Sequence, residues 1–237
     1  MTALLKLEAV SVSYWRGRRR VQVLRDVSFE LDAGEFGGVW ADRSAGKTTL
    51  AKIAAGVLAP DEGRVTFDGH DSRQPDRRGM VHGQIGFATR RGPELESMAV
   101  EAWIASTMLN SFSWRAAIER TQLALDRVGA AEAAAEPWSE LSDGERGLVA
   151  IAQAIVRGPK LVVVDDPVAG LGGARRSKII SLLRSIAAEG VAVLMTAAEL
   201  TELQGADRIW SLEAGRLDGP PARSMGTVVP FRNASGS

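Results

Sequence analysis

Apolar and polar residues alternate, or gather in short apolar runs, through the first third of the chain. Residues 5–12 alternate, residues 21–31 are apolar and rich in types that favour strands, and residues 64–67 follow turn residues at 60–63. The pattern predicts a strand-rich first third.

A strand, a loop and a helix are predicted in succession inside this region. Residues 36–40 form a short apolar run, and residues 41–46 form a loop of mostly small residues. Residues 47–58 then have helical spacing. The apolar residues of the predicted helical face are Leu50, Ile53, Ala54 and Val57.

Helical periodicity dominates the middle of the chain. Residues 92–156 are rich in alanine, and apolar positions recur every three or four residues through 100–109 and 116–128. We expect this region to be a helical insertion.

Strands and helices alternate again in the last third. Residues 161–164 are predicted as a buried strand, residues 177–188 as an amphipathic helix ended by Gly190, and residues 191–195 as another strand. This alternation predicts βαβ units and a parallel sheet. The tail at about 219–237 is rich in Pro, Gly, Ser and Asn, and we expect it to be flexible.

The composition argues against several kinds of site. The 237 residues include 29 Lys and Arg against 29 Asp and Glu, so no net charge attracts nucleic acid. The absence of Cys, with only His70 and His82, argues against disulfides, zinc sites and a histidine-based triad. No run of about eighteen apolar residues occurs, and the start is too short and acidic for a secretion signal. We expect a cytoplasmic protein that reaches membranes through a partner.

The loop before the predicted helix matches the phosphate-binding P-loop pattern, except that Ala41 replaces the first glycine. Lys47 is expected to reach the β- and γ-phosphates, and the Thr48 hydroxyl to reach Mg²⁺. A methyl group at Ala41 is expected to cost about 1 kcal/mol where the backbone needs positive φ or close approach. A chance match is disfavoured because a strand precedes the loop and a helix follows it.

A second phosphate-related element is predicted at residues 161–166, where four apolar residues end in Asp165 and Asp166. A Walker B strand has this form, with Asp165 at the carboxyl end of the strand and in position to hold Mg²⁺. Buried strands often end in acidic turns, so this element alone is a weak signal. Together with the phosphate loop it predicts a nucleotide site.

A third motif, residues 141–145 with the sequence LSDGE, lies between these two elements. The order of the motifs resembles that of the ATP-binding cassette domains of ABC transporters, whose signature at this place is LSGGQ. Matching stretches are VLRDVSFELDAGE, AGVLAPDEGRVTFDG and ADRIWSLEAGRL, and the resemblance covers about residues 4–218.

The resemblance implies an α/β fold with a P-loop NTPase core of the ABC type, an N-terminal antiparallel β subdomain and an inserted α-helical subdomain at about 91–156. It implies one nucleotide-binding domain over 1–237. The implied partners are a transmembrane permease and a second cassette, as a homodimer or heterodimer, with no nucleic acid. The implied location is the cytoplasmic face of the cell membrane.

The resemblance also implies ATP and Mg²⁺ as cofactors, with Thr48 and Asp165 as metal ligands and Tyr14 stacked on adenine. An exposed aromatic at a strand end is the alternative for Tyr14. The nucleotide-binding residues are then Tyr14, Asp42, Arg43, Ser44, Ala45, Gly46, Lys47, Thr48, Thr49, Ser142 and Gly144.

Several catalytic positions depart from the family. Asp166 replaces the Glu that orients or deprotonates water, and a shift of about 1 Å in such a group can cost about 100-fold in rate. Ala197 replaces a His and can donate nothing, and Arg90 replaces a Gln and cannot ligate a cation. Gly172 replaces the Asp of the loop that follows Walker B.

The signature motif is altered as well. Ser142 and Glu145 match a capping box, and Asp143 is favourable near a helix amino end, so one interpretation is a better-capped helix. In the family, however, this helix end faces the γ-phosphate bound by the opposite protomer, and added carboxylates would partly cancel its positive end. We favour weakened use of the signature.

These changes lead to the hypothesis of a cassette that binds Mg-ATP but hydrolyses it slowly or not at all on its own. One alternative is a non-catalytic cassette that holds ATP in a heterodimer with a competent partner. Another is a soluble ABC protein of translation or DNA repair.

Two smaller features stay open between functional and structural interpretations. The basic run at 15–20 could bind nucleic acid or lipid headgroups, but with zero net charge we expect a solvated hairpin. Trp103 and Trp114 either pack in the core or contact the permease.

Overall fold

A mixed sheet forms the centre of the computed structural model, which describes residues 3–42, 44–71, 83–89, 92–93 and 97–219. The sheet has six strands in the order β10-β9-β3-β8-β7-β6. All neighbours are parallel except β10 and β9, as the alternation of strands and helices predicts. The strands are β3 (Phe36–Trp40), β6 (Ile85–Ala88), β7 (Leu161–Asp165), β8 (Ala192–Ala197), β9 (Arg208–Glu213) and β10 (Arg216–Asp218). Arg43, Arg90 and residues 220–237 of the predicted tail lie outside the described residues.

A second, antiparallel sheet is built from the first third of the chain. It has four strands in the order β2-β1-β4-β5. The β1–β2 hairpin is longer than the alternating pattern predicts, because the pairing continues to Arg16 opposite Arg19 around a turn with Gly17 at φ 61°. The strands are β1 (Leu5–Arg16), β2 (Arg19–Leu31), β4 (Glu62–Phe67) and β5 (His70–Asp71).

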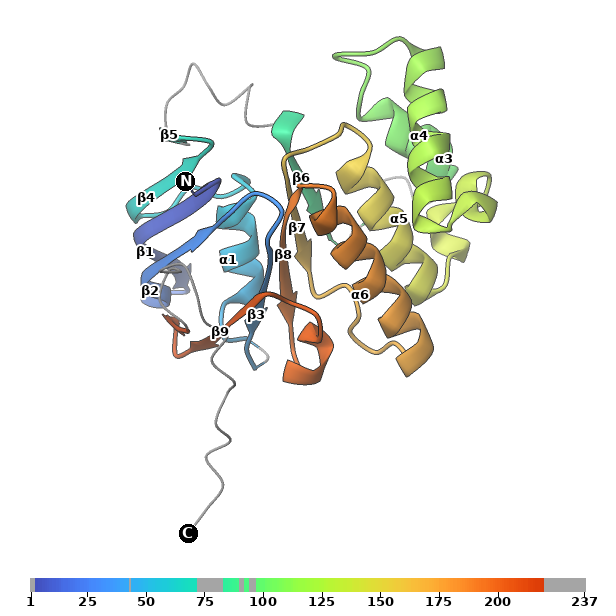
Figure 1. Ribbon diagram of the computed structural model, residues 1–237. Helices are drawn as coiled ribbons and strands as arrows, with labels where there is room; N and C mark the ends of the chain where they lie inside the picture. Colours follow the sequence, from blue (N-terminus) through green and yellow to red (C-terminus); the bar gives the residue numbers. More distant parts are fainter. Residues whose placement is uncertain (1–2, 43, 72–82, 90–91, 94–96, 220–237) are drawn as a thin grey trace.

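Helix α1 (Lys47–Ala54) lies between the two sheets (Figure 1). It ends earlier than the prediction of 47–58, because Gly56 adopts φ 69° and Val57 donates its N–H back to the Lys52 carbonyl. Val57 lies after the end of the helix and is 59% exposed, so the prediction that it shares a helical face with Leu50, Ile53 and Ala54 is wrong.

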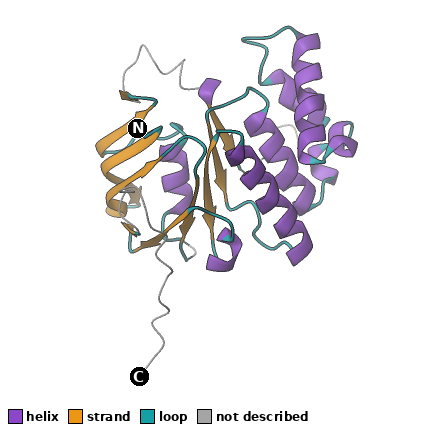
Figure 2. Cartoon of the chain, viewed as in Figure 1, coloured by secondary structure: helices purple, strands orange, loops and turns teal. Residues whose placement is uncertain are grey.

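The other helices lie on the opposite face of the mixed sheet (Figure 2). Helices α5 and α6 pack on the sheet, α4 packs against the outer side of α5, and α3 packs against α4 (Figure 1). Helix α6 begins before the predicted 177. No helix in the described part of the chain is long and apolar enough to span a membrane. The elements are α3 (Val100–Ser106), α4 (Trp114–Val128), η2 (Ala131–Ala134), η3 (Trp138–Glu140), α5 (Asp143–Ile155), α6 (Gly173–Ala188) and η4 (Leu200–Leu203).

Strand β7 contributes to two hydrophobic cores, one on each face of the mixed sheet. Its alternate residues Val162 and Val164 pack with α5 and α6. Leu161 and Val163 pack with α1 and the antiparallel sheet. Because successive side chains of a strand point to opposite faces, a run of four apolar residues is buried on both sides. The run therefore fixes the carboxyl end of β7 between the two layers.

A buried ion pair ties the start of β3 to β9. Arg208 donates to both carboxylate oxygens of Glu35, one of them at 2.7 Å, and to the Glu30 carbonyl at 2.6 Å. Its guanidinium lies 5.0 Å from the centre of the Trp210 ring. Charged groups with this degree of burial are stable only when paired and hydrogen-bonded, so the pair helps to position the strand that enters the phosphate loop.

Trp138 joins three segments that are distant in the sequence. A Cβ atom added to Gly92 would lie 2.2 Å from the Trp138 ring nitrogen, so the backbone after β6 lies directly against the indole. Trp103 of α3 meets the same ring edge-on, with centroids 5.1 Å apart. The guanidinium of Arg146 in α5 lies 5.9 Å from its centre. Trp103 therefore packs inside the helical region, which supports the structural interpretation of that residue.

Candidate functional site

The phosphate loop starts at the carboxyl end of β3, beside β8. Ala41 donates its N–H to the Ala197 carbonyl at 3.2 Å and is buried. Ala41 is not among the residues with positive φ, so the cost expected from a left-handed backbone at this position does not arise. The positive φ angles in the described part of the loop are at Ser44, 68°, and Gly46, 111°. Glycine is therefore needed at the end of the loop more than at its start.

Lys47 is buried at the first position of α1. Its ammonium group donates to the carbonyl oxygens of Ala41 and Asp42, the second at 3.1 Å. Gly46 precedes α1 and provides no side-chain cap, and the first turn of the helix carries no acidic residue. The backbone N–H groups of this helix end and the Lys47 ammonium are thus available to an anion.

Asp165 and Asp166 are both connected to Thr196, at the end of the neighbouring strand β8. The Thr196 hydroxyl donates to the Asp165 carboxylate at 2.8 Å and accepts the Asp166 N–H at 3.1 Å. Thr196 is fully buried. The sequence pattern does not single it out, although a polar residue after an apolar strand run is a signal that could have. The hydroxyl orients the carboxylate predicted to hold Mg²⁺.

Ala197 follows Thr196 on β8, next to Asp165 and Asp166. Its methyl side chain offers no hydrogen-bond donor and no titratable group. It is fully buried and stands opposite Trp40 in the pairing of β3 and β8. The Trp40 indole N–H donates to the Ala198 carbonyl at 3.1 Å. A methyl group in this place can neither donate to phosphate nor exchange a proton.

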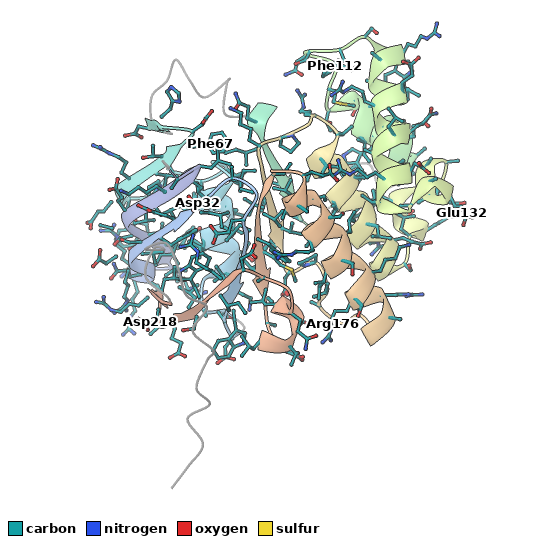
Figure 3. The ribbon with its side chains drawn as sticks, viewed as in Figure 1. Asp32, Phe67, Phe112, Glu132, Arg176 and Asp218 are labelled. Atoms are coloured by element: carbon teal, nitrogen blue, oxygen red, sulfur yellow. The ribbon has the colours of Figure 1, made fainter. Side chains whose placement is uncertain are left out.

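The segment after Asp166 leads to the amino end of α6. Gly172 precedes the helix, is exposed and provides no side-chain cap. Arg176 lies near this end of α6, at the edge of the molecule remote from Phe112 (Figure 3). Its guanidinium lies 3.8 Å from the Glu199 carboxylate and 3.9 Å from that of Glu202. Gly172, which stands where the family has Asp, therefore contributes no side chain to this segment.

Tyr14 lies on β1 next to the first turn of α1. Its hydroxyl is 3.5 Å from the Thr49 hydroxyl, and its side chain is 38% exposed. Thr49 is buried, whereas Thr48 beside it is exposed. The aromatic ring and the phosphate loop are thus parts of one continuous surface.

Ser142 and Glu145 form a complete capping box at the amino end of α5. The Glu145 carboxylate accepts the Ser142 hydroxyl at 2.6 Å and the Ser142 N–H at 2.8 Å. The Ser142 oxygen accepts the Glu145 N–H at 3.4 Å. The bond from the Ser142 hydroxyl is the main cause that lowers the pKa of Glu145. Glu145 stays ionised at neutral pH, and the hydroxyl proton of Ser142 is directed to it.

The signature residues face α6 and not the phosphate loop. A cavity of about 210 Å³ lies between α5 and α6 and is lined by Ser142, Gly144, Glu145 and Arg175, among others. A Cβ atom added to Gly144 would lie 3.3 Å from the Arg175 side chain. The described structure therefore groups the predicted site residues into two sets. The first, around the carboxyl ends of β3, β7 and β8, contains Tyr14, Asp42, Ser44, Ala45, Gly46, Lys47, Thr48, Thr49, Asp165, Asp166 and Ala197; the second contains Ser142 and Gly144.

Comparison with known proteins identifies relatives along most of the chain. The family model described as ABC transporter matches residues 24–169. The phosphonates import ATP-binding protein PhnC 3 of Nostoc sp. is 32% identical, with 90% of this chain and 85% of the relative covered. The cell division ATP-binding protein FtsE of Escherichia coli is 30% identical, with 91% and 98% covered.

Solved structures show the same fold. The dimeric structure of MJ0796, a bacterial ABC transporter cassette, matches with a TM-score of 0.84 at 22% identity, covering 93% of this chain and 100% of that one. A second structure of MJ0796 is a post-hydrolysis state bound to ADP and Pi, with the same TM-score. These likenesses confirm the predicted P-loop core with its antiparallel sheet and helical insertion. Since the family model spans more than half of the chain, and relatives of 30% identity or more cover nine tenths of it, the chain belongs to the ABC transporter family as an ATP-binding subunit.

Proposed function

We propose that this subunit binds Mg-ATP and couples cassette dimerisation to a separate transmembrane permease, with weak or absent hydrolysis of its own. It then works at the cytoplasmic face of the cell membrane. The observation that carries the proposal is that one edge of the sheet keeps the groups that bind a nucleotide but has altered residues at the catalytic positions. Lys47, Asp165 and Thr196 offer the groups that hold a metal nucleotide, while Asp166 and Ala197 stand where the family acts on water.

The described residues fit a nucleotide that brings its own metal. No group of three or more His, Cys, Asp or Glu side chains in the described part of the chain could hold a metal ion alone. Mg²⁺ usually takes only one or two protein ligands together with phosphate oxygens and water. Thr48 and Asp165 would hold the ion, which would supply positive charge that neutralises the phosphates. Lys47 and the amino end of α1 bind the phosphates, and Tyr14 takes the base.

Weak turnover is expected from the groups around the attacking water. Asp166 is a shorter base than Glu, and its backbone is held at φ 54° with its N–H on Thr196. The buried Ala197 methyl cannot stabilise charge on the γ-phosphate. The site therefore retains binding groups and lacks two of the groups that act in the transition state.

In a dimer that sandwiches ATP, this chain would contribute its signature to the nucleotide held by its partner. There, Glu145 holds the hydroxyl proton of Ser142 and adds negative charge beside a phosphate. This contact favours a second candidate, a non-catalytic cassette that holds ATP in a heterodimer with a competent partner. A soluble ABC protein of translation or DNA repair is a third possibility, and it requires that no permease co-purifies.

The helical region offers a surface for the permease. Trp114, at the start of α4, is 51% exposed, and Leu109, before the helix, is 49% exposed. Exposed large apolar residues of this kind mark contact surfaces. We expect Trp114→Ala to weaken recovery of the complex from membranes, whereas Trp103→Ala destabilises the fold because Trp103 packs on Trp138.

The binding part of the proposal is tested by titrating the purified subunit with Mg-ATP in a calorimeter. Lys47→Ala should weaken binding by about 100-fold, because it removes charge-assisted hydrogen bonds to phosphate. Lys52→Ala, in the last turn of the same helix, is the matched control and should bind like wild type. Chelation of Mg²⁺ and Asp165→Asn should each weaken binding as well. Equal affinity of wild type and Lys47→Ala would refute nucleotide binding at this loop.

The catalytic part is tested by steady-state ATPase activity of the complex purified with its permease. Turnover that survives Asp166→Asn in this chain, while Lys47→Ala lowers nucleotide occupancy, supports an ATP-holding role. Loss of turnover with Asp166→Asn shows a working ATPase and refutes weak hydrolysis. Asp166→Glu should raise turnover if the missing methylene is the limitation.

A further inference from the structure

Trp40 is the last residue of β3 and lies at the entrance to the phosphate loop. In the parallel pairing of β3 and β8, Trp40 is opposite Ala197, so the two side chains are on the same face of the mixed sheet. Ala197 belongs to the hydrophobic cluster on that face, and Trp40 packs against the same cluster. An indole and a methyl group are therefore neighbours at the edge of the sheet where the phosphate loop begins.

The indole is anchored to the segment that follows β8. Its N–H donates to the Ala198 carbonyl at 3.1 Å, one residue past Ala197. Neighbouring strands are roughly 5 Å apart, so a ring that starts opposite Ala197 and reaches the Ala198 carbonyl extends along the end of β8. The Glu202 carboxylate accepts the Ala198 N–H at 3.1 Å. The backbone of Ala198 is therefore held through both its carbonyl and its N–H.

Space for a larger side chain at position 197 is limited on this face. Ala197 is fully buried, and so are Met195, two residues earlier on β8, and Leu203 of η4. A Cβ atom added to Gly38, opposite Met195, would lie 2.9 Å from the Leu203 side chain. Trp40, in contrast, is only half-buried. Among these neighbours, the indole is therefore the group whose removal would open space beside position 197.

We propose that Trp40 is a positioning residue of the nucleotide site, whose indole excludes from position 197 any side chain large enough to contact the γ-phosphate. The inference rests on the proposed nucleotide binding and deepens it. Ala41 donates its N–H to the Ala197 carbonyl at 3.2 Å, so position 197 lies next to the start of the phosphate loop. A donor side chain here would be next to the anion that the loop binds. The indole N–H instead bonds to the Ala198 carbonyl.

A double-variant cycle measured by urea denaturation tests the fit of the two side chains without nucleotide. Ala197→His should overpack the site and lower the urea midpoint. In the Trp40→Val background, the same substitution should cost roughly half as much or less, because the indole is gone. Val39→Ala is the matched control, since Val39 precedes Trp40 on β3 and packs in the cluster on the opposite face. The cost of Ala197→His should be unchanged in that background, and an unchanged cost in Trp40→Val as well would refute the inference. If Ala197→His does not fold in either background, Ala197→Asn takes its place in the same cycle.

Calorimetry with Mg-ATP and Mg-ADP tests the link to the γ-phosphate, which ADP lacks. Trp40→Val/Ala197→His should raise the preference for ATP over ADP by about tenfold, because the imidazole then donates to the γ-phosphate. Each single variant should keep the preference of wild type within about twofold. A purely structural role of Trp40 would change the affinities for ATP and ADP by the same factor and leave the preference unchanged in the double variant.

The other outcomes overturn the inference in distinguishable ways. If Ala197→His alone raises the preference for ATP as much as the double variant does, the indole excludes nothing. If the double variant is stable but keeps the wild-type preference, position 197 does not face the γ-phosphate and the assignment is wrong. If wild type binds no Mg-ATP, the proposed function and the nucleotide part of the inference both fail, and the denaturation cycle decides only whether Trp40 limits the size of residue 197.

Discussion

Helices α1 and α5 begin with the same backbone chemistry and use it differently. Each amino end carries N–H groups without partners inside the helix. At α1, Gly46 provides no side-chain cap and the first turn has no acidic residue. At α5, Ser142 and Glu145 cap one another, and Asp143 adds a second carboxylate. The comparison teaches that first-turn side chains decide whether a helix end is open to an external anion or is satisfied by the protein itself.

The two helix ends are also positioned by different means. The loop that enters α1 is held by the ends of β3 and β8, and a Cβ atom on Gly46 would lie 3.1 Å from Val23 and Leu24 of β2. The start of α5 is held by contacts within residues 139–146. Changes at the ends of β3 and β8 should therefore disturb the first site more than the second.

The largest effect is expected from the ion pair at the start of β3. Arg208→Ala leaves Glu35 buried without its partner, which should lower the free energy of unfolding by about 3–5 kcal/mol. Urea denaturation measures the loss. Arg127→Ala breaks the exposed Arg127–Glu189 pair and is the matched control, expected to cost less than about 1 kcal/mol. Equal costs for both variants would show that burial adds nothing to the first pair.

A smaller effect is expected at Thr196. Thr196→Val keeps the shape but leaves the Asp166 N–H and the Asp165 carboxylate without the hydroxyl, at a cost of about 1–3 kcal/mol. It should also weaken Mg-ATP binding, and Thr196→Ser should restore both properties. Thr121→Val removes an equally buried hydroxyl, bonded to Ala117 in α4, and should cost stability without affecting nucleotide affinity. If Thr196→Val binds Mg-ATP like wild type, Thr196 does not position the carboxylate that is proposed to hold Mg²⁺.

The capping box of α5 gives a third prediction. Glu145→Gln removes a carboxylate that caps the helix, so the free energy of unfolding should fall by about 0.5–1 kcal/mol. Gln keeps an oxygen that accepts from Ser142, but the change removes the negative charge beside that hydroxyl and makes the helix end more positive, so ATP-dependent dimerisation measured by light scattering should increase. Glu132→Gln, at an exposed position in η2, is the control for loss of charge alone. A decrease in both stability and dimerisation would contradict the comparison of the two helix ends.

The smallest effect is a pH dependence of the same contact. Because the folded-state pKa of Glu145 is lowered from its ordinary value of 4.5, its contribution is present above that pH and is lost as pH falls through the folded-state value. The difference in urea midpoint between wild type and Glu145→Gln should therefore shrink as pH is lowered below about 4.5. If the difference between the two urea midpoints does not change with pH, the ionisation of Glu145 does not contribute to stability.

Features formed by residues close together in the sequence could be predicted. The phosphate loop, the buried run of β7 and the capping box of Ser142 and Glu145 are all contained in short segments, so spacing alone identifies them. The end of α1 is predicted less well, because Gly56 competes with an apolar face that continues to Val57. Fold topology follows from the alternation of strands and helices.

Features made by distant residues could not be predicted in the same way. Thr196 contacts Asp165 across 31 positions, and Arg208 contacts Glu35 across 173. The position of Trp40 opposite Ala197 depends on strand register, since a shift by one residue would place one of the two side chains on the other face. These contacts form because the folded sheets bring distant residues together, and the sequence has many other charged and polar residues that could have been paired instead.

The close contact of Gly92 with Trp138 also limits the order in which this protein can change over generations. A side chain at position 92 collides with the indole, so a first substitution there is rejected while Trp138 is intact. A smaller residue at 138 would make room, but it also removes a neighbour of Trp103 and Arg146. The tolerated order of change at these two positions is therefore the indole first and the glycine second.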